Sequence, residues 1–174
     1  MNLFLGTFDR VLQVMADTVG VQQVVSQRGL LTNLRLEHRL RDEGVGWMEL
    51  RDRAEFTEWC LADDEYGLCV VAGFSYILPE SFIARCRAVI NFHPGLVQVC
   101  RGPQPVGNAI VQGHREFGVT VHVIDSEGID AGPIVAQLGF AIDFGCTYTV
   151  NYRLVLELME RMAVDVLPLF TGQD

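Results

Sequence analysis

Two hydrophobic periods alternate along the chain. Nearly continuous apolar runs at 68–72 and 88–92 are typical of strands that are buried on both faces of a sheet. Apolar residues three or four positions apart at 9–17 and 147–170 predict amphipathic helices. Strands that alternate with helices indicate an α/β fold, with a mostly parallel, twisted sheet and helices on both faces. Weaker patterns of the same kinds predict strands at 2–5, 20–27, 47–50, 119–124 and 134–142, and helices at 34–41, from the cap residue Asp52 to 62, from Pro79 onward and at 104–112.

For two of these segments the pattern also predicts which face is buried. Polar and apolar residues alternate at 119–124, which predicts a half-buried strand in which His122 packs beside its neighbours. The helix at 147–170 has a broad apolar stripe, which we expect to pack on the core, with a homodimer face as the alternative. The stripe contains Val150, Leu154, Leu158 and Met162.

Composition and charge narrow the class of protein. The 174 residues are 49% hydrophobic and 20% charged, which is typical of one globular domain spanning 1–174. Thirteen basic against 22 acidic residues give a formal charge of −9, which argues against a nucleic-acid partner. No apolar run approaches the roughly 20 residues of a membrane span, and no secretory signal pattern opens the sequence. We therefore expect a cytoplasmic protein without a membrane partner.

A metal centre or a disulfide framework is not expected. The five cysteines form no C-x-x-C pair. His93, His114 and His122 lack the close spacing of paired metal ligands. Cys100 lies beside Arg101, but an incidental loop thiol is the simpler interpretation than a nucleophile.

Candidate chemistry lies at the end of the apolar run 88–92. Asn91 and His93 are two positions apart, so both side chains point to one face of an extended chain. Pro94 and Gly95 then end the strand. Ligands of open α/β sheets bind at the carboxyl ends of the strands. An amide and an imidazole are therefore expected at a binding edge.

A second candidate is the acidic loop 125–133, which follows another predicted strand. Asp130 lies between Gly128 and Gly132, where the backbone can approach a ligand closely. A carboxylate can hold an imidazole in one protonation state, and an amide can donate to a developing oxyanion. Asn91, His93 and Asp130 together therefore suggest an acid–base site.

Several motifs in order resemble the folate-dependent formyltransferase family, the catalytic domain shared by glycinamide ribonucleotide, methionyl-tRNA and sugar-nucleotide formyltransferases. The resemblance extends over about 68–137 and rests on the order and spacing of N-x-H-P, R-G and D-x-G. The matching segments are Ala72-Gly73-Phe74-Ser75-Tyr76-Ile77-Leu78-Pro79, Ile90-Asn91-Phe92-His93-Pro94-Gly95-Leu96, Arg101-Gly102-Pro103, Gly118-Val119-Thr120-Val121-His122 and Gly128-Ile129-Asp130-Ala131-Gly132-Pro133-Ile134.

This resemblance implies a Rossmann-like fold and an enzyme that transfers a formyl group from 10-formyltetrahydrofolate to an amine, without a metal. The family's catalytic trio falls on Asn91, His93 and Asp130, and the Asp130 charge is expected to raise the His93 pKa. By the same resemblance, main-chain groups of the 73–78 and 124–130 loops hold the folate. The implied folate-binding residues are Phe74, Ser75, Tyr76, Ile77, Leu78, Ile124, Asp125, Gly128 and Ile129, and the implied substrate-binding residues are Arg101, Gly102 and Pro103.

One departure bears on the acceptor. The purine enzymes of the family carry a Gly/Ser-rich phosphate loop after the first strand, whereas this chain has Gly6-Thr7-Phe8-Asp9-Arg10. A helix N-terminus that bears Asp9 is a poor phosphate site. The net charge also argues against methionyl-tRNA. We therefore expect a small-molecule amine, on a sugar nucleotide or an aminoacyl group. The alternatives are glycinamide ribonucleotide with an unusual phosphate site, and a folate- or ligand-binding protein without turnover.

Overall fold

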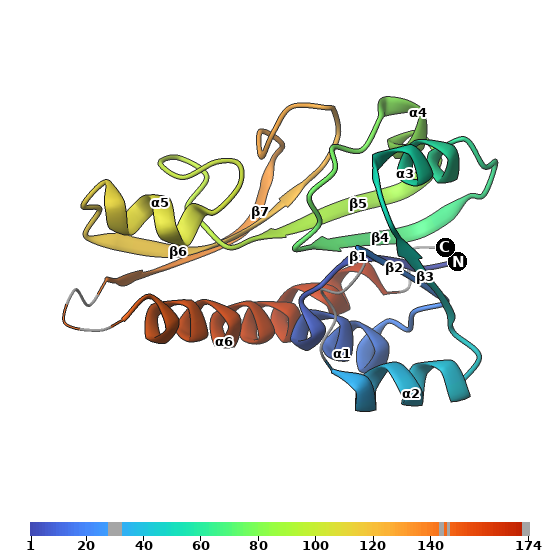
Figure 1. Cartoon of the computed structure of the whole chain (residues 1–174), viewed down its shortest axis with the longest axis horizontal. Coiled ribbons are helices and arrows are strands. Elements are labelled where there is room, and N and C mark those ends of the chain that lie inside the picture. The colour runs from blue at the N-terminus through green and yellow to red at the C-terminus, as the bar shows by residue number, and fades with distance from the viewer. Residues whose placement is uncertain (28–32, 143–144, 146, 172–174) are drawn as a thin grey trace.

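A computed structural model describes residues 1–27, 33–142, 145 and 147–171, and it shows one twisted seven-stranded sheet (Figure 1). The strand order is β3-β2-β1-β4-β5-β6-β7. The first five strands are parallel, whereas β6 is antiparallel to both of its neighbours. The strands are β1 (Leu3–Gly6), β2 (Gln23–Gln27), β3 (Gly46–Leu50), β4 (Tyr66–Ala72), β5 (Cys86–His93), β6 (Glu116–Val123) and β7 (Ile134–Ala141).

Helices cover both faces of the sheet, and Figure 1 shows α1 and α6 on one side with α3 and α4 on the other. A first core contains buried residues of α1, α2, α5 and α6, and a second core contains those of α3 and α4. The predicted α/β class with a mostly parallel sheet is thereby confirmed. The helices are α1 (Asp9–Thr18), α2 (Leu34–Asp42), α3 (Arg53–Cys60), α4 (Glu80–Ile83), α5 (Pro105–Val111) and α6 (Tyr148–Val166), which a 3-10 turn (Leu167–Phe170) continues.

Local sequence signals account for several helix starts. Asp52 caps α3 by accepting a hydrogen bond from the Glu55 amide at 3.0 Å, as the sequence predicted. Asn33 caps α2 in the same way, with 3.2 Å to the Leu36 amide. Pro79 is the residue before α4, and that helix has only four residues. The chain therefore changes direction between β4 and β5 with little helix.

Two expectations about burial were wrong in part. Strand β6 is buried on both faces, with Thr120 0% and His122 1% exposed. One face packs in the first core, and the polar face contacts loops, because Thr120 donates to the Gly95 carbonyl and His122 lies beside Asp130. In α6, Leu158 and Met162 of the predicted stripe pack on the first core, as expected, whereas Val150 and Leu154 are each 43% exposed. Its buried face is shifted by one residue, because the helix is apolar over a wider arc than the predicted stripe. That face consists of Asn151, Val155, Met159, Met162, Ala163 and Val166.

No helix in the described parts of the chain combines the length and the apolar character that a membrane crossing needs. The four described cysteines, Cys60, Cys69, Cys86 and Cys100, are free thiols, and Cys146 lies outside the described residues.

The end of β1 lies very close to the end of β4, the parallel strand beside it, and leads into the site. The Ala72 carbonyl accepts hydrogen bonds from the Thr7 amide at 2.9 Å and the Phe8 amide at 3.3 Å. Gly6 has φ +141°, and a Cβ atom there would lie 1.9 Å from the Ala72 oxygen. Only glycine fits this close approach of the two strands.

Replacing Gly6 with alanine is therefore expected to lower the free energy of unfolding by about 2–4 kcal/mol, because backbone must shift. Gly107 is the matched control, since it lies within α5 and a Cβ there meets nothing within 4 Å. Gly107→Ala should stabilise the protein by about 0.5–1 kcal/mol. Urea unfolding of both variants measures the difference, and equal effects would contradict the packing described.

Candidate active site

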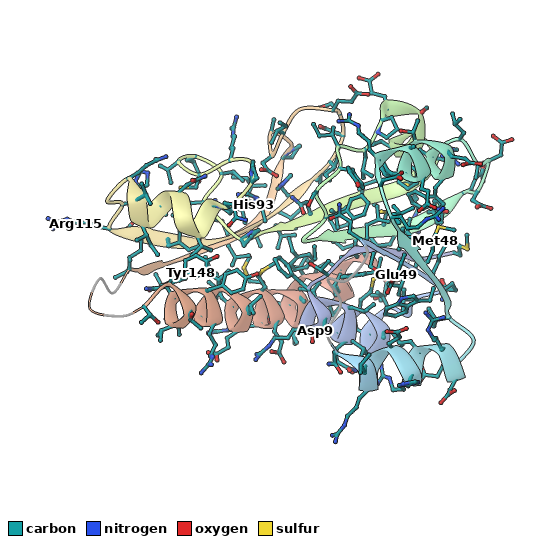
Figure 2. All side chains as sticks on the ribbon, viewed as in Figure 1. Asp9, Met48, Glu49, His93, Arg115 and Tyr148 are labelled. Carbon is teal, nitrogen blue, oxygen red and sulfur yellow. The ribbon has the colours of Figure 1, made fainter. Side chains whose placement is uncertain are left out.

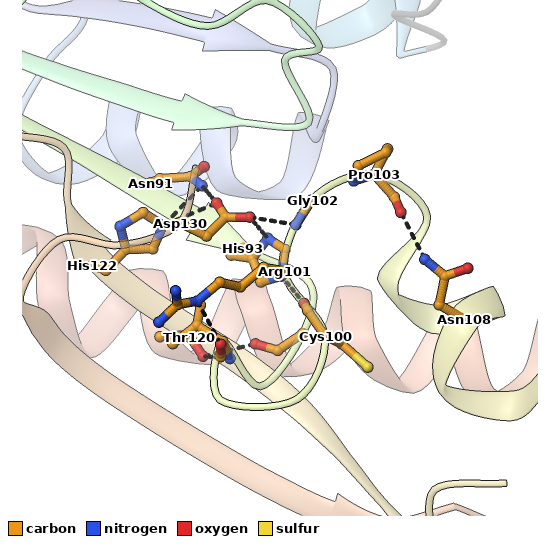
Figure 3. A network of polar contacts seen from close by, with 12 residues as sticks. Asn91, His93, Cys100, Arg101, Gly102, Pro103, Asn108, Thr120, His122 and Asp130 are labelled. Carbon is orange, nitrogen blue, oxygen red and sulfur yellow. Dashed lines mark hydrogen bonds and ion pairs between the residues drawn. The ribbon is translucent and has the colours of Figure 1, made fainter. Parts of the chain in front are cut away.

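Two neighbouring strands and one loop bring the predicted residues together (Figure 3). Asn91 and His93 lie on β5, as predicted, and His122 lies on β6 directly opposite Asn91 in the strand register. Asp130 comes from the loop between β6 and β7 and has φ +47°. Residues other than glycine adopt such a conformation rarely, although Asn and Asp do so more often than most. The fold holds Asp130 in it at the centre of the site.

The Asp130 carboxylate joins four groups. Its Oδ2 atom lies 3.3 Å from His93 Nδ1 and accepts a hydrogen bond from the Gly102 amide at 2.8 Å. Its Oδ1 atom accepts one from Asn91 Nδ2 at 3.2 Å and lies 3.3 Å from His122 Nε2. The expected meeting of Asn91, His93 and Asp130 around one point is therefore present in the structure.

Backbone carbonyls define where the two imidazoles carry their protons. A carbonyl can only accept, so His93 Nε2, 2.7 Å from the Cys100 oxygen, carries a hydrogen. By the same reasoning His122 Nδ1 donates to the Val123 oxygen at 3.0 Å, and its Nε2 lies 3.1 Å from Asn91 Nδ2 and 3.3 Å from Asp130 Oδ1. Neutral His93 therefore directs the lone pair of Nδ1 at Asp130, and a proton added there bridges the two side chains.

Burial and neighbouring groups shift the pKa values of His93 and Asp130 in this network. Burial lowers the pKa of His93, and the opposing effects of the Asp130 charge and the Cys100 carbonyl do not cancel it. The Asp130 charge does raise the His93 pKa, as expected, but desolvation of the ring outweighs it and the net shift is downward. Burial alone would raise the pKa of Asp130, but contacts with His122, His93 and the Gly102 amide lower it overall. At neutral pH the site therefore contains a carboxylate beside a neutral imidazole.

These shifts predict how stability depends on pH. A histidine with a lowered pKa binds fewer protons when folded than when unfolded, so folding is favoured less as the pH falls below the usual value of 6.5. Asp130 adds a second loss below its usual value of 3.8. Between pH 7 and 5, His93 should make the free energy of unfolding fall by at most about 1.4 kcal/mol per pH unit.

His93→Gln is expected to flatten that part of the curve, since glutamine does not titrate. His38→Gln, at an exposed position of α2, is the matched control and should leave the slope unchanged. Urea unfolding at several pH values measures both. The same slope in His93→Gln as in the unchanged protein would contradict a lowered His93 pKa.

A cavity of about 530 Å³ lies against this network. Asn91, His93 and Asp130 are in its wall. Of the residues expected to hold folate, all line the cavity except Asp125, namely Phe74, Ser75, Tyr76, Ile77, Leu78, Ile124, Gly128 and Ile129. Of those expected to hold the second substrate, Gly102 and Pro103 line it. Arg101 does not, and its Nε atom donates to the Val97 carbonyl at 2.8 Å.

Other lining residues were missed by sequence reasoning. His122 lines the cavity although it was assigned to packing, and only its register opposite Asn91 could have revealed its place. Further lining residues were not among those expected to form the site. They are Thr7 and Phe8 after β1, Gln104, Pro105 and Val106 at the start of α5, and Tyr148 and Tyr152 in α6. In the part of the chain that the structure describes, no group of three His, Cys, Asp or Glu side chains is arranged to hold a metal ion.

Comparison with known proteins gives the family of the chain. The sequence pattern of the family described as "Formyl transferase" matches residues 32–167, which include Asn91, His93 and Asp130. The chain therefore belongs to the formyl transferase family.

The similar proteins of this family carry two different names. The chain is 35% identical over 101 residues to "Methionyl-tRNA formyltransferase" of Wolbachia pipientis subsp. Culex pipiens, covering 58% of this chain and 33% of that protein. It is 38% identical over 80 residues to "Phosphoribosylglycinamide formyltransferase" of Bacillus subtilis, covering 46% and 40%. The alignments thus span well under half the length of both relatives. The solved structure of glycinamide ribonucleotide transformylase 1 from Geobacillus kaustophilus has the same fold, with a TM-score of 0.77, 22% identity and coverage of 98% of this chain and 97% of that chain.

Proposed function

We propose that the protein transfers a formyl group from 10-formyltetrahydrofolate to the primary amine of a small-molecule acceptor. The observation that carries this proposal is the contact of the Asp130 carboxylate with both Asn91 and His93 in the wall of one cavity. The cavity volume of about 530 Å³ falls within the usual range for small-molecule sites. Family membership supports the same reaction class.

The aromatic wall of the cavity suits the flat ring system of the folate. The loops 74–78 and 124–130 line one part of it, where Phe74 and Tyr76 pack edge to face and Tyr76 stacks on Phe56 of α3 with ring centroids 4.8 Å apart. Such an aromatic wall suits a flat heterocycle. As the family resemblance implies, main-chain groups of both loops would hydrogen-bond its edge. 10-Formyltetrahydrofolate, when bound, supplies a formyl carbon on a nitrogen that can leave.

The chain's own residues then have two tasks. As the amine nitrogen bonds to the formyl carbon, negative charge grows on the carbonyl oxygen, and an N–H of Asn91 can donate to it in place of the 3.2 Å contact with Asp130. The amine also loses a proton. His93 Nδ1 and Asp130 Oδ2, which lie 3.3 Å apart, can hold that proton between them. That proton is returned to the folate nitrogen as its bond to the formyl carbon breaks. Atoms and charge balance, with a formamide and tetrahydrofolate as the products.

The test is to incubate the protein with 10-formyltetrahydrofolate and a panel of amines and to follow tetrahydrofolate release by absorbance. The panel includes amino acid esters, an amino sugar nucleotide, glycinamide ribonucleotide and methionyl-tRNA, since relatives bear names that refer to the last two. Release that requires one particular amine supports transfer. Release without any amine indicates hydrolysis, and binding without release would favour a folate-binding protein instead; either result contradicts the proposal.

A further inference from the structure

The lining residues of the cavity pack against two different cores, and we call these two parts of its wall the two ends of the cavity. Phe74, Tyr76 and Ile124 pack against the second core, whereas Phe8 and Tyr152 pack against the first. All five line the same cavity, as do Asn91 and His93 of β5. Because the first three belong to the loops proposed to hold folate, the end that contains Phe8 and Tyr152 is left for the acceptor amine.

This second end is built from aromatic and other apolar surface. Tyr148 and Tyr152 lie one turn apart in α6, and their rings stack with centroids 5.7 Å apart and an interplanar angle of 13°. Tyr148 is 46% exposed, and Figure 2 shows it at the start of α6. Burial raises the pKa of Tyr152, so its hydroxyl stays neutral. Val106 of α5 and Phe8 complete the apolar surface.

The charges around this end would repel a phosphate. Among the described residues that line the cavity there is no arginine, and the sequence contains no lysine. Two arginines near these segments are already engaged, Arg10 with Glu160 Oε2 at 2.7 Å and Arg101 with the Val97 carbonyl. Asp9 occupies the first turn of α1, and Asp130 is a carboxylate at the centre of the cavity. Phosphate recognition rests on Arg or Lys pairs or on a free helix N-terminus.

We propose that this end of the cavity binds an amine with an apolar or aromatic body and without a phosphate group, of the kind that an ester of an apolar amino acid provides. The inference rests on the proposed function and names the class of its acceptor. The Asp130 carboxylate attracts the amine while it is still an ammonium ion, which releases one proton to solvent before the neutral amine attacks, and the stacked tyrosines cover its apolar body. Glycinamide ribonucleotide and an amino sugar nucleotide both lack this combination.

The test compares phenylalanine methyl ester with O-phosphotyrosine methyl ester, which presents the same amine on an aromatic body that bears a phosphate, and with glycinamide ribonucleotide. We expect kcat/KM to be at least about tenfold higher for the unphosphorylated ester than for either phosphorylated amine. Tyr152→Ala should lower kcat/KM for the phenylalanine ester about tenfold, mainly through KM, because lost apolar contact weakens binding. Leu154→Ala, at an exposed position of α6 outside the cavity wall, is the matched control and should change neither value.

A gain-of-function variant tests the charge argument separately. Tyr148→Arg places a cation at the exposed rim of this end, so it should raise kcat/KM for the phosphotyrosine ester relative to the phenylalanine ester by about tenfold. Transfer to phenylalanyl-tRNA, measured beside the free ester, distinguishes an RNA-linked acceptor from a small one. The same dependence on Tyr152 with either acceptor supports the apolar subsite.

Failure of this inference and failure of the proposed function give different results. Preference for a phosphorylated amine, or a Tyr152→Ala variant as active as the unchanged protein, would overturn the inference while formyl transfer stands. If no amine is formylated, the proposed function fails, and calorimetric binding of phenylalanine methyl ester still decides the inference. We then expect a dissociation constant about tenfold higher in Tyr152→Ala than in Leu154→Ala. Equal binding by the two variants would contradict it.

Discussion

Replacing Asp130 with asparagine is expected to lower kcat/KM for formyl transfer about 10³- to 10⁴-fold. The substitution removes the charge that faces His93 Nδ1 at 3.3 Å and replaces one acceptor oxygen with a donor. Asn91 and the Gly102 amide both donate to this carboxylate, so one of them loses its partner. Asparagine tolerates the left-handed backbone of this position, with φ +47°, so the effect should fall on catalysis more than on folding.

Asp125→Asn is the matched control for this variant. Asp125 lies in the same loop, outside the cavity wall, and its carboxylate accepts a hydrogen bond from the Ser126 hydroxyl at 3.3 Å. Its kcat/KM should stay within about twofold of the unchanged protein, as is usual for a side chain outside the reaction site. Thermal unfolding of both variants separates loss of activity from loss of fold. Equal activity of folded Asp130→Asn and Asp125→Asn would remove Asp130 from the reaction.

Replacing His93 with alanine is expected to lower kcat/KM about 10²- to 10³-fold while the fold survives. The buried ring provides the nitrogen that can hold the proton of the attacking amine beside Asp130. Its removal also leaves the Cys100 carbonyl, 2.7 Å from Nε2, without this donor. A loss of about 1–3 kcal/mol in stability should accompany the kinetic effect, because a buried acceptor loses its partner.

His114→Ala is the control for loss of an imidazole away from the cavity. His114 contacts the Gln112 side chain and does not line the cavity. We expect an unchanged kcat/KM in this variant, measured by tetrahydrofolate release at saturating 10-formyltetrahydrofolate. A folded His93→Ala protein with a near-normal rate would refute the assigned role.

The fold was predictable because its signals are local. The apolar runs at 68–72 and 88–92 became the central strands β4 and β5, which lie side by side. The order of strands and helices followed from hydrophobic period alone. Asn91, His93 and Asp130 were singled out partly because each lies at the end of a predicted strand or in the loop after one, where α/β folds bind ligands, and partly because the family resemblance assigns its catalytic trio to them.

Features that depend on distant contacts were not predictable. The buried face of α6 was displaced by one residue because its apolar arc is broad, and only its neighbours α1 and β6 select the face that is covered. His122 enters the site through the antiparallel pairing of β6 with β5, whereas sequence reasoning assigned no strand order. Arg101 adjoins the site in sequence, yet its side chain turns to the Val97 carbonyl. Tyr148 and Tyr152 reach the cavity from the far end of the chain.

The most direct test of the account follows the formyl carbon itself. 10-Formyltetrahydrofolate labelled with ¹³C in the formyl group is incubated with the protein and phenylalanine methyl ester, and the products are separated and examined by mass spectrometry. The account predicts a labelled N-formyl ester formed in equal amount to tetrahydrofolate, with neither formed at a measurable rate by Asp130→Asn. Label recovered only as free formate, or a labelled amide produced equally well by Asp130→Asn, would contradict it.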